Sequence, residues 1–193
     1  MKRKLALTIV ACLMFAAGVT GSALAIMTST ATVGSNTFTS GTVIISTDHP
    51  STAIVSFSGM MPGDSVGANA LVVSNTGSAQ LRYAISSSAT NADTLGLKDA
   101  LTLTVKTIDV TTPGVPCDNF DGTQLYTGDL DSTSGKLVGD AAQGAQAGDR
   151  TLAAAASETL CFKVSFASSA TGPAGAATTA TFTFSAEQTS NNP

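Results

Sequence analysis

The sequence is poor in the side chains on which most enzymes rely. Its 193 residues include no tryptophan, two tyrosines and one histidine, His49. A Ser-His-Asp or Cys-His mechanism would have to run through His49, which lies beside Pro50 in a predicted turn. The sequence has no His-Glu-x-x-His motif, no phosphate-binding glycine loop and no dinucleotide fingerprint. It therefore predicts a protein that is not an enzyme and that has neither catalytic residues nor a cofactor.

Charged residues are also scarce, at 11% of the chain, and acidic residues outnumber basic ones. A protein that binds nucleic acids or anionic membranes needs clustered Lys and Arg, so the composition argues against both partners. Sugar-binding platforms use aromatic rings, which are poorly supplied here. The sequence does not exclude a pair of carboxylates that hydrolyses glycosides, because it does not show how far apart two carboxylates lie in space.

The first 25 residues have the three parts of a secretory signal peptide. A basic start at Lys2–Lys4 precedes an uncharged apolar run over residues 5–19, and small residues at 22–25 suit cleavage after Ala25. The run is shorter than the roughly 20 apolar residues of a membrane span. The residues that end at Cys12 resemble a lipoprotein box only loosely. We expect cleavage and secretion rather than a membrane anchor or lipidation.

The remaining 168 residues are enough for one domain with a core. All 13 acidic residues but only six of the nine basic ones lie in this part, which gives it a net charge of −7. Two cysteines remain, Cys117 and Cys161. In an oxidising compartment we expect a disulfide between them rather than two buried thiols. It would contribute roughly 3–4 kcal/mol in the chain-entropy model.

Alternation of apolar and polar residues predicts β-strands through most of the chain. The strand at 81–85 is expected to pair with the strand at 70–74 as a hairpin. Residues 93–100 suggest a short helical turn or a packed loop, and residues 132–150 a long surface loop. The predicted strands are 42–46, 53–57, 70–74, 81–85, 101–108, 125–126, 159–166 and 179–186.

This pattern predicts an all-β fold, a jelly-roll-like antiparallel β-sandwich with one short helix. The sandwich is expected over residues 39–187, followed by a polar, frayed tail at 188–193. The uncharged, proline-free segment 26–38 can add as a strand to a sheet edge, its own or a neighbour's. Its candidate contact residues are Ile26, Met27, Ala31, Val33 and Phe38.

The segment 118–122 is similar to a calcium-binding loop, because it places Asp and Asn oxygens on a tight turn. The glutamate of a full EF-hand pattern is absent. A turn held by hydrogen bonds from Asp or Asn side chains to the backbone is therefore favoured. Asp118 and Asp121 stay weak calcium candidates, and no other metal site is predicted.

Several turn motifs follow the predicted signal peptide in order. Asn36–Thr42 (Asn-Thr-Phe-Thr-Ser-Gly-Thr) comes first, then Pro62-Gly63-Asp64, and then Asn75-Thr76-Gly77-Ser78. A leucine-rich stretch at 95–101 and the segment 125–130 complete the series. This order resembles the TasA/camelysin family of secreted biofilm-matrix and spore-coat-associated fibre proteins. The motif residues are Gly41, Pro62, Gly63, Asp64, Asn75 and Gly77.

The resemblance implies a jelly-roll sandwich, processing by a dedicated signal peptidase and assembly into extracellular fibres. In such fibres the freed N-terminal segment inserts as a strand into the next subunit, so residues 26–38 would be the donor strand. The partners implied are further copies of the chain, the signal peptidase and other matrix components. Peptidase activity is ascribed to some camelysins, but this sequence supplies neither a metal triad nor a nucleophile.

Three functions follow from these observations. The leading hypothesis is a structural subunit of an extracellular matrix or a cell-surface layer. The alternative is a monomeric extracellular binding module for envelope glycans or other surface ligands. A secreted hydrolase is the third, and it would need an acid/base pair with shifted pKa values in a cleft.

Overall fold

The computed structural model describes residue 35 and residues 37–108, 115–170 and 174–192. The chain divides into two units, residues 1–39 and 40–193, and the fold described below is that of the second unit. The predicted signal peptide and four of the donor-strand residues, Ile26, Met27, Ala31 and Val33, lie outside the described residues. Phe38 is described and has no regular secondary structure.

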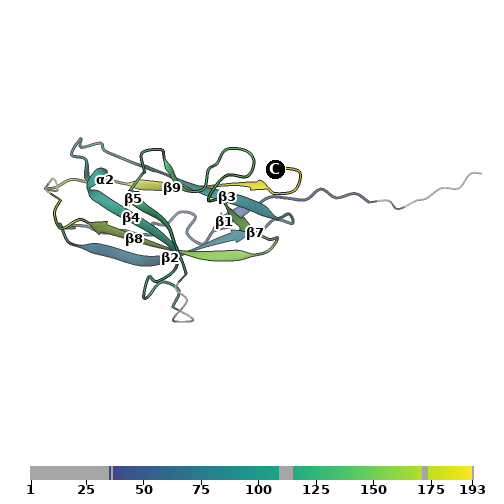
Figure 1. Cartoon of the computed structure of the whole chain (residues 1–193), viewed down its shortest axis with the longest axis horizontal. Coiled ribbons are helices and arrows are strands. Elements are labelled where there is room, and N and C mark those ends of the chain that lie inside the picture. The colour runs from purple at the N-terminus through teal and green to yellow at the C-terminus, as the bar shows by residue number, and fades with distance from the viewer. Residues whose placement is uncertain (1–34, 36, 109–114, 171–173, 193) are drawn as a thin grey trace, which may run out of the picture. The chain divides into compact units, whose positions relative to one another are not determined.

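The second unit consists of two antiparallel sheets (Figure 1). In the first sheet the strands lie in the order β1, β2, β8, β4 and β5. In the second, β9 pairs along the full length of β3, and β6 and β7 pair with different parts of β3. The strands are β1 (Ile45–Thr47), β2 (Ser65–Asn75), β3 (Leu81–Ala89), β4 (Leu101–Thr107), β5 (Gln124–Asp129), β6 (Lys136–Val138), β7 (Arg150–Leu152), β8 (Ser157–Phe166) and β9 (Ala180–Gln188).

The alternating pattern places one face of each central strand in a shared core. In β4, Leu101, Leu103 and Val105 are buried, whereas the threonines between them are half-exposed. A single apolar cluster joins residues of both sheets. One short helix, α2 (Leu97–Ala100), precedes β4. The predicted all-β antiparallel sandwich with one short helix is therefore confirmed.

The strand predicted at 53–57 is wrong. Ile54 and Val55 pack against the core from an irregular segment. The ladder of β1 ends just before this segment, at Asp48. There the Asp48 backbone N–H donates to the Val72 carbonyl (3.2 Å), and the Asp48 carboxylate accepts the Val72 N–H (3.0 Å). Within 53–57, Ile54 and Val55 are therefore half-buried without a partner strand, whereas Phe57 is exposed.

The predicted hairpin of the strands at 70–74 and 81–85 is also wrong, because β2 and β3 lie in different sheets. The connection between them is an arch that crosses from one sheet to the other. The Asn75 amide donates both to Ala79 within the arch and to Leu152 in β7, so it holds the arch against the second sheet.

Two short strands, β6 and β7, lie within or directly after the region predicted as a long loop. Each has three residues, too few for alternation to be visible in the sequence. At the other end of the second sheet, hydrogen bonds continue past β9: the Thr189 N–H donates to the Gln80 carbonyl (3.2 Å). No helix in the described part of the chain has the length and apolarity to cross a membrane.

Candidate functional site

Two of the turn motifs meet where the second unit begins. The Thr42 N–H donates to the Ser78 hydroxyl (3.0 Å), and the N–H groups of Ser78 and Ala79 donate to the Thr42 carbonyl (3.0 and 3.1 Å). A side chain at Gly77 would place its Cβ 2.3 Å from that carbonyl oxygen. Glycine is therefore required at 77, because the backbone of Thr42 approaches so closely.

Asn75 is the buried centre of the same junction, with 1% of its surface exposed. Its amide nitrogen donates to the carbonyls of Ala79 (2.8 Å), Ala153 (3.0 Å) and Leu152 (3.2 Å). Its amide oxygen accepts the Gly77 N–H (3.0 Å). One side chain thus joins β2, the arch and β7, which explains why this motif needs asparagine.

The Pro62-Gly63-Asp64 motif ties the start of β2 to the end of β8. Gly63 has φ +102° and donates its N–H to the Phe166 carbonyl (2.8 Å), and the Phe166 N–H donates to the Asp64 carbonyl (2.8 Å). The Asp64 carboxylate accepts the Met61 N–H (2.8 Å). The Pro62-Gly63-Asp64 motif and the motif around Asn75 therefore hold parts of the sandwich together.

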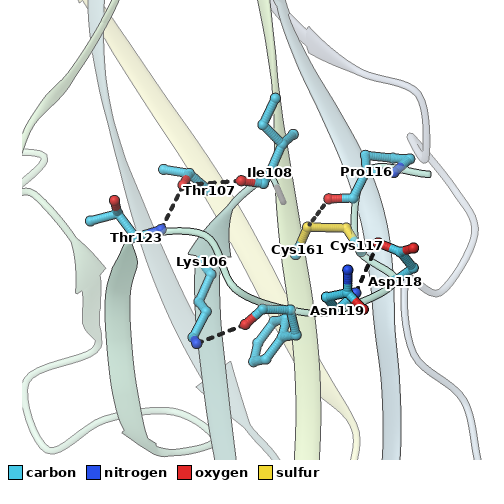
Figure 2. The surroundings of a disulfide bond; sticks show 10 residues. Lys106, Thr107, Ile108, Pro116, Cys117, Asp118, Asn119, Thr123 and Cys161 are labelled. Atoms are coloured by element: carbon cyan, nitrogen blue, oxygen red, sulfur yellow. Dashed lines mark hydrogen bonds between the residues drawn. A yellow bond between two sulfur atoms is a disulfide. The ribbon is translucent and has the colours of Figure 1, made fainter. Parts of the chain in front are cut away.

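A disulfide joins Cys117 to Cys161, as predicted (Figure 2). Cys161 points to the outer face of β8 and yet is fully buried, because the loop that carries Cys117 covers it. The same loop is held by Lys106, whose Nζ donates to the Phe120 carbonyl (2.8 Å) and lies 4.7 Å from the centre of its ring. The disulfide therefore fixes this loop to the outside of the first sheet.

The weak calcium candidates lie in this loop. The Asp118 carboxylate accepts the N–H of the next residue, Asn119 (2.9 Å). Asp121 also has an interaction partner. Within the described ranges, no group of three or more His, Cys, Asp or Glu could hold a metal ion.

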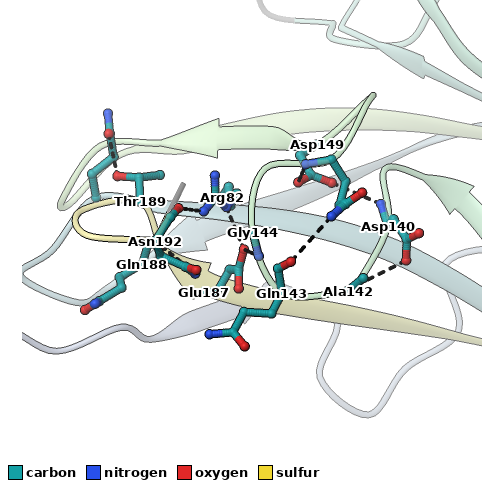
Figure 3. A network of polar contacts seen from close by, with 12 residues as sticks. Arg82, Asp140, Ala142, Gln143, Gly144, Asp149, Glu187, Gln188, Thr189 and Asn192 are labelled. Carbon is teal, nitrogen blue, oxygen red and sulfur yellow. Dashed lines mark hydrogen bonds and ion pairs between the residues drawn. The ribbon is translucent and has the colours of Figure 1, made fainter.

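A network of polar contacts lies on the outer face of the second sheet (Figure 3). Arg82 of β3 is 7% exposed, and its Nε donates to the Glu187 carboxylate of β9 (2.6 Å). The same carboxylate accepts the Gly144 N–H (3.0 Å), and Arg82 also donates to the Asn192 carbonyl. The network thus links the loop between β6 and β7 and the C-terminal residues to β3 and β9.

Sequence reasoning missed this network and the other long-range polar contacts. Arg82 occupies an outward position of a strand, which is an ordinary place for a charge. Segments far along the chain surround it: the Asn192 carbonyl accepts from Arg82, and the Gly144 loop bonds its partner Glu187. A signal was present nonetheless: Arg82 is one of only six basic residues beyond the predicted signal peptide, and it lies in an otherwise uncharged strand.

Open strand edges are a further feature of the described residues that could bind a partner. In the first sheet the outermost strands are β1 and β5, and in the second β9 lies on one side of β3 and β6 and β7 on the other. Each such edge presents backbone N–H and C=O groups that can pair with another strand.

A family model described as camelysin metallo-endopeptidase matches residues 1–192. The chain belongs to this family. The match confirms the resemblance drawn from the turn motifs. No curated protein matches the chain.

The family description names a metalloenzyme, so the donor residues of this chain need comparison with a zinc-peptidase centre. Such centres take three protein ligands, commonly two or three of them histidines. The chain has one histidine, whose Nδ1 lies 2.8 Å from the Asp48 carboxylate. That carboxylate is already bonded to the Val72 N–H at the end of β1. The residues present do not fit a peptidase metal centre.

Proposed function

We propose that this chain is a secreted structural subunit that assembles into extracellular fibres of a biofilm matrix or cell-surface layer by donor-strand exchange. Membership of the camelysin family supports a secreted, matrix-associated role at the level of the family. The observation that carries the finer proposal is a sandwich with open strand edges, preceded by an uncharged segment with strand-like composition. A subunit with both a donor and an open edge makes head-to-tail contacts that propagate.

The donor segment is residues 26–38, freed by cleavage after Ala25. Thr28, Thr30 and Thr32 fall on one face of an extended strand, and Ala31 and Val33 fall on the other. This is the alternation of a strand with one face on a core and one in water. Main-chain hydrogen bonds then provide affinity, and the inward side chains set the register.

We propose a structural role rather than proteolysis for this member of the family. The support is the scarcity of residues that could bind a metal ion. The one histidine is engaged at the end of β1, and Cys117 and Cys161 are joined in a disulfide. The alternative function, binding of a surface glycan, is favoured by one observation, a hollow of about 160 Å³ beside Arg82, Asp140 and Glu187. The polar groups of that hollow already bond to one another, which makes it a weaker basis than the open edges.

The mature chain starting at Ile26 should form filaments that are visible by electron microscopy and sediment at high speed. A chain starting at Ser40 should stay monomeric. Two matched variants test the strand itself. Ala31→Lys places a charge on the inward face and should abolish sedimentation, whereas Thr30→Lys places it on the outward face and should retain it. Filaments from the truncated chain would contradict donor-strand exchange.

A further inference from the structure

The open edges of the sandwich differ in how well they could accept a strand. Natural edge strands are commonly protected by shortness, bulges, charges or proline. The strands β1, β6 and β7 have three residues each, and β1 is followed by Asp48-His49-Pro50. In β5 the pairing with β4 shifts register, and the strand ends in a charge at Asp129.

The part of β2 beyond β1 is protected in a different way. Its pairing with β8 shifts register between Val66 and Asn69. The Asn69 amide donates to the Ile54 carbonyl (2.6 Å), so the segment before β2 is fastened to it. Asp48 occupies the backbone groups of Val72, as described above.

From Ala180 to Glu187, β9 has none of these protections, and only at its last residue does a side chain engage the strand, where the Asn192 amide donates to the Gln188 carbonyl (3.3 Å). It pairs with β3 over nine consecutive residues, from Ala180 to Gln188, with no shift of register. Its sequence has no glycine, proline, lysine or arginine, and its one charge, Glu187, is engaged by Arg82 near the end of the strand. Among the described residues, no strand other than β3 pairs with β9.

The inward side chains of β9 are also incompletely covered. Phe182 and Phe184 pack against the core, with Phe184 6.3 Å from the Tyr83 ring and Phe182 5.4 Å from the Phe162 ring. Both phenylalanines stay half-exposed, whereas Tyr83 and Phe162 are fully buried. A strand added beyond β9 would remove this apolar surface from water, which is favourable.

The predicted donor segment matches β9 in length and in pattern. Residues 26–34 are nine residues without charge, and β9 has nine. Thr28, Thr30 and Thr32 of the donor would continue the outward threonines of β9, Thr181 and Thr183. Cross-strand threonine pairs stabilise a sheet. One such pair already occurs in the first sheet, where the Thr104 and Thr127 hydroxyls are 3.1 Å apart.

We propose that the outer edge of β9 is the acceptor for residues 26–34 of a second copy of the chain. This inference rests on the proposed function and specifies its binding site. The added strand extends the second sheet, places its threonines in line with Thr181 and Thr183, and covers Phe182 and Phe184 with small apolar residues.

Disulfide trapping between two mature chains tests the assignment. Cys117 and Cys161 are bonded to each other, so an introduced cysteine is the one free thiol of each mature chain. A donor chain with one cysteine is mixed with an acceptor chain with another, and mild oxidation follows once filaments form. A cross-link between two such chains is necessarily intermolecular. The donor variants are Thr28→Cys, Thr30→Cys and Thr32→Cys, the acceptor variants are Thr181→Cys, Thr183→Cys and Ser185→Cys, and the matched control on the other sheet is Thr127→Cys.

The expected result is a cross-linked dimer for at least one donor–β9 pair, well above the level reached with Thr127→Cys. Filaments whose donor cysteines cross-link to β5, or to none of the β9 positions, would overturn the β9 assignment and leave the proposed function standing. Absence of filaments from the unmodified mature chain would overturn both.

Discussion

At the scale of single residues, the buried side chain of Asn75 links the two sheets. Its amide completes four hydrogen bonds in a buried site that joins both sheets. Buried polar groups left without partners cost about 1–3 kcal/mol each. The neighbouring Gly77 is fixed by the approach of the Thr42 carbonyl, so the motif Asn-x-Gly is required as a unit.

Replacement of Asn75 by alanine should therefore destabilise the fold by about 3 kcal/mol, because it leaves several backbone groups unsatisfied. Urea unfolding followed by circular dichroism measures this change. Asn91→Ala is the matched control: Asn91 is exposed, its side chain accepts one backbone N–H, from Gly96, and its removal should cost less than about 1 kcal/mol. Equal losses in the two variants would contradict the central role of Asn75.

At the scale of elements, the Arg82–Glu187 contact fastens two segments, the loop between β6 and β7 and the C-terminal residues, to the second sheet. The hydrogen bond from the Arg82 guanidinium lowers the pKa of Glu187 below its ordinary value of 4.5. Since the pKa is lower in the folded state, this carboxylate stabilises the fold above about pH 4.5. The contribution disappears as the pH falls through the folded-state pKa.

Glu187→Gln should thus lower the melting temperature at pH 7, and the difference from the unchanged protein should shrink steadily as the pH falls below 4.5. Thermal unfolding across a pH series measures both effects. Asp99→Asn is a suitable control, because Asp99 is an exposed partner of Lys98, which keeps a second partner in Asp131. A difference that is constant with pH would show that Glu187 acts by packing rather than by charge.

The elements also show what the sequence could and could not predict. Alternation located β4 and β8 because their inward residues meet one continuous core. It failed at 53–57, where Ile54 and Val55 pack against the core from an irregular segment that has no partner strand. It also failed to place β2 and β3 in different sheets, because that outcome depends on bonds from Asn75 to β7, a strand too short to be recognised.

The assembly hypothesis came from the order of turn motifs, and the structure shows why those motifs are needed. They fix the start of the second unit at Thr42 and the joint between β2 and β8 at Gly63. The proposed acceptor edge could not be predicted, because only the pairing of the described strands reveals that β9 has β3 as its single neighbour among them.

At the scale of the whole molecule, the net charge of −7 beyond residue 25 opposes the approach of identical subunits. Salt screens such repulsion over about 10 Å at 0.1 M. Assembly of the mature chain should therefore accelerate as sodium chloride rises from about 0.01 M to 0.15 M. Light scattering measures the rate, with sucrose of equal osmolarity as the control. Slower assembly in salt would indicate that opposite charges attract at the interface.

The junction of Thr42 with Ser78 and Ala79 has a mechanical consequence in the proposed fibre. Tension along a chain of subunits would reach each sandwich through its N-terminal segment and arrive first at the bonds of Thr42. These bonds lie on the arch that Asn75 joins to β2 and β7. The load is therefore divided between both sheets at its point of entry, instead of peeling the three-residue β1 away from the edge of one sheet.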